Sequence, residues 1–226
     1  MNDQIDFGNF SNDDFADNPE PRCPCVLVLD TSSSMGGAPI QELNAGLQLF
    51  PQDVGQDDLA AKRVEVAIVT FGGHVTQVQD FTTVDNFMGT PLTASGGTPM
   101  GEALELAVQM VRDRKQTYKD NYIKYFRPWI FLITDGAPTD SIERAQQFIP
   151  DGENAKEFIF FAVGVEGADM STLATLATKQ APLKLKGVNF RELFRWLSAS
   201  MQQVSGEETS QETRALPQLT WAEVGG

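Results

Sequence analysis

Three oxygen-bearing side chains alternate along a short stretch that follows an apolar run. The run at 25–29 is built of strand-forming residues, and Asp30, Ser32 and Ser34 follow it at every second position. In an extended segment these side chains project to the same side. Hard divalent cations take oxygen ligands, which indicates a metal site. Asp and Ser are also ordinary turn and helix-capping residues, so a simple strand-to-helix turn explains this stretch equally well.

Two further segments carry oxygen ligands of the same kind. Thr98 lies in a Gly-rich sequence ahead of a helical pattern, and Asp135 ends the apolar run 129–134. Thr98 would also serve as the N-cap of that helix, so a structural role for it needs no metal. If the strands before Asp30 and Asp135 are neighbours, the three segments meet at the carboxyl edge of a sheet, where open α/β sheets bind ligands. A turn alone would need neither Thr98 nor Asp135.

The elements that would position these residues alternate along the chain. Strand patterns occur at 25–29, 63–71, 74–81, 129–134, 157–164 and 183–185. Helical patterns occur at 38–51, 100–119, 139–148, 169–178 and 190–204. Gly72-Gly73 predicts a hairpin with His74 at its exposed tip. The order predicts an α/β fold with a doubly wound, mostly parallel central sheet of about six strands, one antiparallel edge strand and helices on both faces.

The three segments together resemble the von Willebrand factor type A (vWA) domain, which has a Rossmann-like fold. Asp30 to Ser34 matches the Asp-x-Ser-x-Ser pattern of that family. Thr98 in Gly-Gly-Thr-Pro matches its second-loop threonine, and Asp135 in Thr-Asp-Gly matches its third-loop aspartate. The resemblance covers roughly residues 23–204.

This resemblance implies a metal-ion-dependent adhesion site (MIDAS) that binds Mg²⁺, or alternatively Mn²⁺ or Ca²⁺. Ser32, Ser34 and Thr98 would be direct hydroxyl ligands, while Asp30 and Asp135 would often act through water. Because neutral hydroxyls leave the cation electrophilic, an Asp or Glu carboxylate of a protein partner would fill its open position. The resemblance therefore predicts a metal-dependent protein–protein interaction module, an adaptor or scaffold, and not an enzyme.

The first loop is also similar to a narrower group, the bacterial tellurium-resistance TerY-type subfamily. The similarity lies in Leu-Asp-Thr-Ser-Ser-Ser-Met at 29–35, followed by Pro39-Ile40 and Glu42-Leu43-Asn44. It implies partners in stress-response complexes, including kinase- and phosphatase-like proteins.

Two other functions stay open at this point. One is a Mg²⁺-dependent phosphoester hydrolase with Asp30 as nucleophile. The sequence lacks an Asp-x-Asp pair, a Gly-x-x-x-x-Gly-Lys-Ser/Thr loop and a basic residue beside the proposed metal loops, which disfavours it. The other is a vWA scaffold with a vestigial metal site, against which every ligand position matches the family pattern.

Composition limits the partners. The chain carries 31 acidic and 17 basic residues, a formal charge of −14, so nucleic acid would be repelled. The basic residues at 112–127 are predicted to be a solvated helix end, which suits the helix dipole. The N-terminus is acidic where a signal peptide needs a basic start, and no apolar run reaches the roughly 20 residues of a membrane span. These features predict a cytoplasmic protein that binds no membrane.

The chain divides into three parts by composition. Residues 1–22 are acidic and rich in Asn, Asp and Pro, which predicts a disordered segment. Residues 23–204 would form the vWA domain, and 205–226 a polar acidic tail, whose patch 216–221 could dock on the domain or on a partner. Cys23 and Cys25 are too close for an unstrained disulfide, so reduced thiols are expected.

Overall fold

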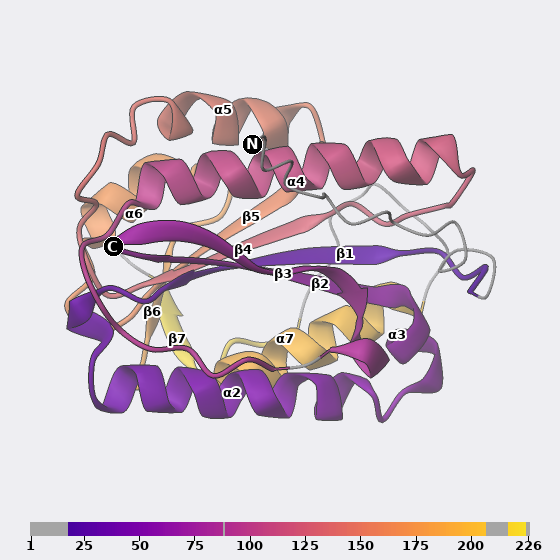
Figure 1. Cartoon of the computed structure of the whole chain (residues 1–226), viewed down its shortest axis with the longest axis horizontal. Coiled ribbons are helices and arrows are strands. Elements are labelled where there is room, and N and C mark those ends of the chain that lie inside the picture. Colours follow the sequence, from indigo (N-terminus) through magenta and orange to yellow (C-terminus); the bar gives the residue numbers. More distant parts are fainter. Residues whose placement is uncertain (1–17, 88, 207–216, 225–226) are drawn as a thin grey trace, which may run out of the picture.

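One seven-stranded sheet runs through the computed structural model, which describes residues 18–87, 89–206 and 217–224 (Figure 1). Its strands are β1 (Cys23–Asp30), β2 (Val64–Gly72), β3 (His74–Thr83), β4 (Trp129–Thr134), β5 (Ile159–Gly164), β6 (Leu183–Leu185) and β7 (Ala222–Val224). Their order is β3-β2-β1-β4-β5-β6-β7, with β3 and β7 antiparallel to their neighbours and the inner pairs parallel. The carboxyl ends of the parallel strands therefore share one edge.

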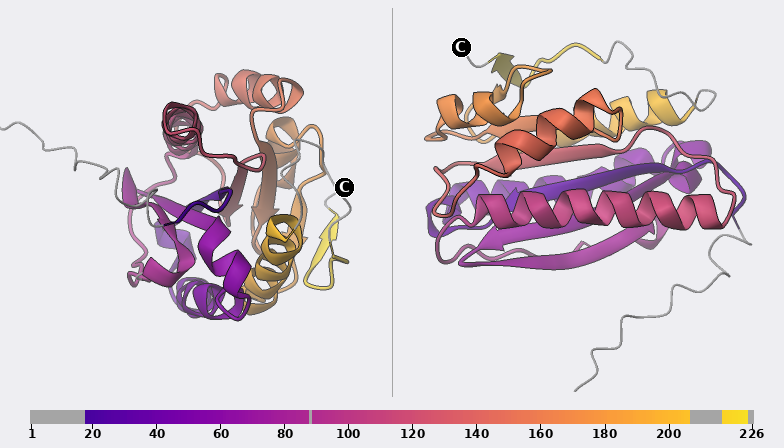
Figure 2. Two further views of the ribbon diagram at one scale, coloured as in Figure 1. Left: turned by 90° about the vertical axis from the view of Figure 1, so that its right-hand side faces the viewer. Right: turned by 90° about the horizontal axis from the view of Figure 1, so that it is seen from above.

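Helices cover both faces of this sheet, as the views along and above it show (Figure 2). On one face lie α2 (Ala38–Val54), α3 (Asp58–Arg63) and α7 (Phe190–Ser205). On the other lie α4 (Met100–Asp120), α5 (Ala145–Asn154) and α6 (Met170–Leu176). Two short 3-10 helices, η1 (Ser33–Met35) and η2 (Val84–Asn86), follow β1 and β3. None of the described helices is long and apolar enough to cross a bilayer.

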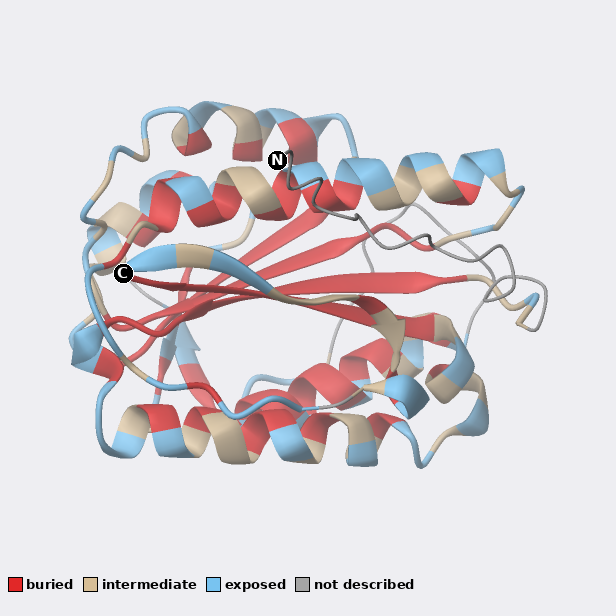
Figure 3. Cartoon of the chain, in the orientation of Figure 1, coloured by how far each residue is buried: buried red, intermediate tan, exposed pale blue. Residues whose placement is uncertain are grey.

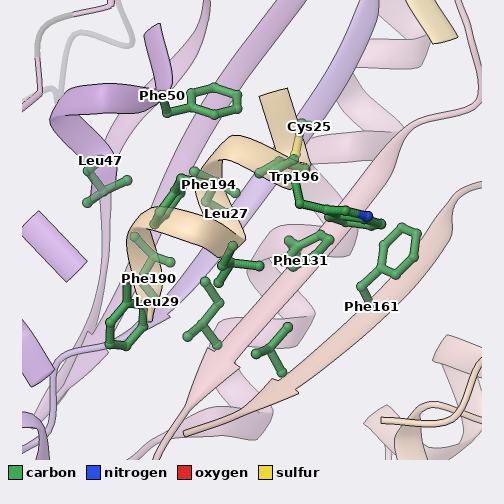
Figure 4. Close-up of a cluster of buried hydrophobic side chains, with 14 of the residues drawn as sticks. Cys25, Leu27, Leu29, Leu47, Phe50, Phe131, Phe161, Phe190, Phe194 and Trp196 are labelled. Atoms are coloured by element: carbon green, nitrogen blue, oxygen red, sulfur yellow. The ribbon is translucent and has the colours of Figure 1, made fainter. Parts of the chain in front are cut away.

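The two layers explain why the inner strands are continuous apolar runs. All residues of β1 are buried (Figure 3). Its side chains alternate between the two faces of the sheet. Leu27 and Leu29 belong to the core under α2 and α7, where Phe50 and Phe194 make an edge contact at 6.0 Å between ring centroids (Figure 4). Val26 and the other residues of opposite parity belong to the core under α4. A strand covered on both faces needs apolar residues at every position.

The predicted fold class is confirmed, and the C-terminal tail adds to it. Trp221 is 1% exposed and packs against Trp196 at 5.6 Å between ring centroids. Strand β7 then pairs with β6, with Leu185 opposite Ala222. The patch whose docking the sequence left open thus lies, from Pro217 onward, on its own domain. The tail residues 207–216 lie outside the described residues.

Residues 1–17 of the predicted disordered segment also lie outside the described residues, but its last residues are held by the domain. The Asn18 amide donates to the Lys62 carbonyl at 2.8 Å, and Arg22 is 1% exposed. Cys23 and Cys25 follow as free, buried thiols, and burial raises the pKa of Cys23 to about 12. As predicted, His74 is exposed at the hairpin tip.

A buried charge cluster occupies the amino edge of the sheet. Glu65, near the start of β2, accepts hydrogen bonds from Arg22 Nε at 2.8 Å and from Arg114 Nη2 at 2.8 Å. The Tyr118 hydroxyl donates to Oε2, the other carboxylate oxygen of Glu65. The prediction of a solvated helix end is therefore wrong for Arg114, because the acidic partner that draws it inward comes from β2 and cannot be seen in the sequence of α4.

Candidate metal centre

The pairing of β1 with β4 brings the first and third predicted loops together. Leu29 lies opposite Ile133, so Asp30 and Asp135 leave the sheet side by side at its carboxyl edge. Asp30 is fully buried and accepts hydrogen bonds from the Ser32 backbone N–H at 2.8 Å and from the Thr134 hydroxyl at 2.5 Å. Both donors are neutral, so they orient this carboxylate without balancing its charge.

A chain of hydrogen bonds links the two loops through serine hydroxyls. Ser32 Oγ lies 2.9 Å from Ser34 Oγ, and Ser34 Oγ donates to Asp135 Oδ1 at 2.7 Å. The extended conformation that the alternating pattern predicts is wrong beyond Ser32, because η1 begins at Ser33. The 3-10 turn nevertheless brings the two hydroxyls together. Neither hydroxyl is spent on capping, since the N-cap residue Ser32 makes no side-chain cap bond.

Thr98 joins this group through the space beside Gly136. A Cβ atom added to Gly136 would lie 3.5 Å from Thr98 Oγ1, 3.8 Å from Ser34 Oγ and 3.9 Å from Asp30 Oδ2. Oxygens from the first and second loops therefore border one small space beside Gly136 of the third loop, and the glycine leaves that space free of side-chain atoms. Of the five residues predicted from the sequence, Asp30, Ser34 and Thr98 border this space, and Ser32 and Asp135 are hydrogen-bonded to Ser34.

The predicted N-cap role of Thr98 is wrong. The N-cap position of α4 is Pro99, without a side-chain cap bond, and the helix start is held instead by Asp140, which accepts from Gly101 N at 3.1 Å and Glu102 N at 2.9 Å. Thr139 also accepts from Thr98 N at 2.9 Å. The Thr98 hydroxyl is thereby released from helix capping.

Thr139 and Asp140 hold the second loop in place, and the sequence pattern did not reveal this. They fall in 139–148, which was predicted to be helical, whereas α5 begins only at Ala145. Their signal was weak, because Thr and Asp are also usual at a helix start. Through these hydrogen bonds, Thr139 and Asp140 tie the third loop to the second.

Backbone hydrogen bonds hold the first two loops together. Ser33 N donates to Gly96 O at 3.0 Å, and Ser95 N donates to Thr31 O at 2.8 Å. Gly96 has φ +71°, and a Cβ there would lie 2.4 Å from Gly73 Cα in the β2–β3 hairpin. The Gly-rich sequence is therefore required by a left-handed turn and a close backbone contact.

Four of the five residues of the site are buried, and one is exposed to solvent. Asp30, Ser32, Thr98 and Asp135 are buried, whereas Ser34 is exposed. Burial raises the pKa of Asp135 above its ordinary value, the Ser34 hydrogen bond opposes this, and the nearby Asp30 charge raises it again. Two converging carboxylates favour a bound cation.

The donor set decides which kind of cation fits. Among the described residues, no three His, Cys, Asp or Glu side chains are placed to hold a metal ion together, so a metal here would rest on hydroxyls as well as carboxylates. Such an all-oxygen set suits hard divalent cations such as Mg²⁺, Mn²⁺ or Ca²⁺. The residues present therefore fit a divalent metal of that class.

Solved structures with the same fold share little sequence with this chain. It is similar to a von Willebrand factor type A protein from Catenulispora acidiphila, with TM-score 0.59 and 17% identity over 80% of this chain and 43% of that one. The proximal thread matrix protein 1 of the mussel byssus, solved with a zinc-occupied MIDAS motif, gives TM-score 0.55 and 14% identity over 81% and 48%. The D319A mutant of the PilB minor pilin from Streptococcus sanguinis gives TM-score 0.57 and 14% identity over 83% and 63%.

The chain thus spans about half the length of two of these relatives, and no curated protein matches it. At these identities the structural likeness shows the fold. The family model described as the von Willebrand factor type A domain matches residues 25–193, which contain all five residues of the candidate metal centre. The chain belongs to the von Willebrand factor type A domain family.

Proposed function

We propose that the chain is a metal-dependent protein-interaction module that binds a partner carboxylate through Mg²⁺ at a MIDAS. Ser32, Ser34 and Thr98 would hold the ion directly, and Asp30 and Asp135 would act through water. Mn²⁺ or Ca²⁺ are the alternative ions. The observation that carries the proposal is the space beside Gly136, bordered within 4 Å by oxygens of Thr98, Ser34 and Asp30.

The arrangement of charge favours binding over catalysis. When bound, the ion would offer an electrophilic position to an incoming carboxylate. The Thr134 hydroxyl and the Ser32 N–H orient the Asp30 carboxylate. Ser34 is exposed, so a partner carboxylate would approach the ion from its side. For a protein of charge −14, a cation between the surfaces offsets the repulsion of an acidic partner. The zinc-occupied MIDAS motif of the mussel protein is consistent with a divalent ion in this fold.

The narrower context rests on the first-loop sequence at 29–35. We propose a TerY-type protein of a bacterial tellurium-resistance or stress-response complex, acting in the cytoplasm. Its partners would be proteins, including kinase- or phosphatase-like ones, and neither nucleic acid nor membranes. Residues 23–204 would be the working domain, flanked by the N-terminal segment and the tail.

The first experiment tests the metal. The melting temperature of the wild-type chain is measured in EDTA and with added Mg²⁺, Mn²⁺ or Ca²⁺, beside Asp30→Ala and the matched control Asp151→Ala, an exposed aspartate. A ligand at 100 times its Kd stabilises by about 2.7 kcal/mol, so the wild type and control should melt several degrees higher with metal. Asp30→Ala should show no rise. A wild type indifferent to all three ions would indicate a vestigial site.

The second experiment tests the metal bridge. Partners are captured with the same three proteins, with and without EDTA. Capture should be lost in EDTA and with Asp30→Ala, and kept with Asp151→Ala. Capture that survives both treatments would contradict a bridge, and metal-dependent hydrolysis of phosphate esters that disappears in Asp30→Ala would favour the hydrolase.

A further inference from the structure

A cleft of about 580 Å³ lies near the amino-terminal ends of β5 and β6, away from the metal centre. Its apolar wall includes Phe161 and Trp196, whose rings meet edge-on at 6.1 Å between centroids (Figure 4). Leu183 on β6 and Leu219 before β7 complete that wall. Leu219 is 37% exposed, so an apolar side chain is left facing solvent beside the cleft. An apolar anchor would find a receiving surface here.

The polar side of the cleft is mostly cationic. Among the described residues that line it, Arg127, Lys156 and Lys179 face one carboxylate, Glu153. Lys156 and Lys179 are exposed, so their ammonium groups are available to an occupant. In a chain of net charge −14, such a concentration of positive charge favours an acidic occupant.

Glu153, the acidic residue among those that line the cleft, is itself buried. It is 5% exposed, and its Oε1 accepts from the Phe160 N–H at 3.1 Å. Its Oε2 is buried and has no hydrogen-bond partner among the described residues. Because this oxygen has almost no exposed surface, an occupant of the cleft meets the exposed lysines and not the Glu153 carboxylate. The apolar wall then favours a peptide with apolar side chains over a simple anion.

We propose that residues 1–17 of the same chain occupy this cleft in cis, with phenylalanine side chains on the apolar wall and aspartates toward the lysines. The segment carries no lysine or arginine, and it combines both required features. Its acidic residues are Asp3, Asp6, Asp13, Asp14 and Asp17, and its aromatic residues are Phe7, Phe10 and Phe15. This docking is independent of the metal centre and of the function proposed for it.

The attachment point of the segment makes the docking geometrically feasible. Cys25 on β1 is two strands from Ile159 at the cleft, since Trp129 pairs with both, which corresponds to roughly 10 Å. From Cys25 back to Asn18 the chain covers at most roughly 25 Å. The stretch between Phe7 and Asn18 can itself span roughly 36 to 40 Å, so Phe7 can reach the cleft.

Amine labelling of the full-length chain tests the proposal. The labelling rates of Lys156 and Lys179 are measured by mass spectrometry against Lys186, an exposed lysine outside the cleft. Tethering gives an effective concentration of roughly 1 mM, so a segment that binds with a Kd of roughly 0.1 mM would be docked about 90% of the time. The two cleft lysines should then react about tenfold more slowly than when the cleft is open.

Two variants of the segment distinguish aromatic anchoring from a general effect. The triple variant Phe7→Ala, Phe10→Ala, Phe15→Ala should restore fast labelling of both cleft lysines. The matched variant Gln4→Ala, Asn9→Ala, Asn12→Ala should label like the wild type. All substitutions lie outside the described domain, whose fold is checked by its melting temperature.

Three results would overturn the proposal. The first is cleft lysines that react as fast as Lys186 in the wild type. The second is equal labelling in the two triple variants. The third is protection that disappears on dilution, because a cis contact is independent of concentration while a second copy or a separate acidic partner is not.

Discussion

Two buried carboxylates at opposite edges of the sheet are stabilised in different ways. Glu65, near the start of β2, is 2% exposed and is bonded to Arg22, Arg114 and the Tyr118 hydroxyl. Asp30, at the end of the neighbouring strand β1, is 0% exposed and accepts from a backbone N–H and a threonine hydroxyl. One carboxylate is neutralised by the chain's own cations, and the other has neutral donors.

The difference separates a structural charge from one suited to an external cation. At the Glu65 cluster, burial alone would lower the pKa of Arg114, but Tyr118 and Glu65 together raise it above its ordinary value, so the pair stays charged. At the candidate metal centre, the Asp30 charge faces a second carboxylate, Asp135, whose pKa is raised by burial and then by Asp30 itself. The first cluster is complete, while the second is favoured by a bound cation.

Removal of the Glu65 carboxylate should destabilise the fold more than a change at Gly136 or Asp140. Glu65→Ala leaves two arginines buried without their carboxylate, which should cost about 3–5 kcal/mol in the free energy of unfolding, measured in urea. The control Glu157→Ala breaks the more exposed ion pair with Arg112 and should cost at most about 1 kcal/mol.

The effect of Mg²⁺ on the stability of Glu65→Ala tests whether the Glu65 cluster and the candidate metal centre are independent. Where Glu65→Ala still folds, its remaining stability should rise with Mg²⁺ by as much as that of the wild type, because the two clusters lie at opposite ends of the strands. A loss near that of Glu157→Ala would show that the buried cluster is not structural. A Mg²⁺ response that vanishes in Glu65→Ala would show that the two edges are coupled.

A methyl group at Gly136 should give an intermediate effect, on metal affinity more than on stability. In Gly136→Ala the new carbon lies 3.5 to 3.9 Å from oxygens of Thr98, Ser34 and Asp30, which is ordinary contact, so the free energy of unfolding should change by less than about 1 kcal/mol. The methyl occupies the space between the proposed ligands, so the Kd for Mg²⁺, measured by calorimetry, should rise by about tenfold or more.

Gly89→Ala is the matched control for this change. A Cβ there would lie 3.6 Å from the Phe87 ring and near none of the metal loops, so its Mg²⁺ affinity should equal that of the wild type. Equal Kd values for Gly136→Ala and the wild type would place the ion elsewhere.

Local patterns predicted most of the strands and the grouping of the site, because both depend on short sequence signals. The apolar runs ending at Asp30 and before Asp135 are covered on both faces, and that coverage is visible as composition. The contacts that the sequence did not reveal join distant segments. Arg114 meets Glu65 across 49 residues, and Trp221 enters the core beyond a polar stretch. The sequence also allowed Thr98 to cap α4, whereas Asp140, from another loop, accepts the hydrogen bonds of that helix start.

Asp140→Ala should change the affinity for metal less than Gly136→Ala does, and it tests whether the contacts of Asp140 support the candidate metal centre as well as the start of α4. The variant removes the acceptor of two N–H groups at the start of α4, which should cost about 1 kcal/mol in the free energy of unfolding. Asp57→Ala is a close match, since Asp57 accepts from Leu59 N and Ala60 N at the start of α3, on the other face of the sheet. Both variants should lose similar stability in urea.

The two variants should differ in their affinity for Mg²⁺. Asp140 and Thr139 tie the third loop to the segment that carries Thr98, so Asp140→Ala loosens one of the three loops that carry the proposed ligands. Its Kd, measured by calorimetry, should rise about tenfold, in the range found when residues that orient metal ligands are removed, while that of Asp57→Ala stays at the wild-type value. If both variants bind Mg²⁺ as tightly as the wild type, Asp140 only caps α4, and Thr98 is held in place by its remaining backbone contacts.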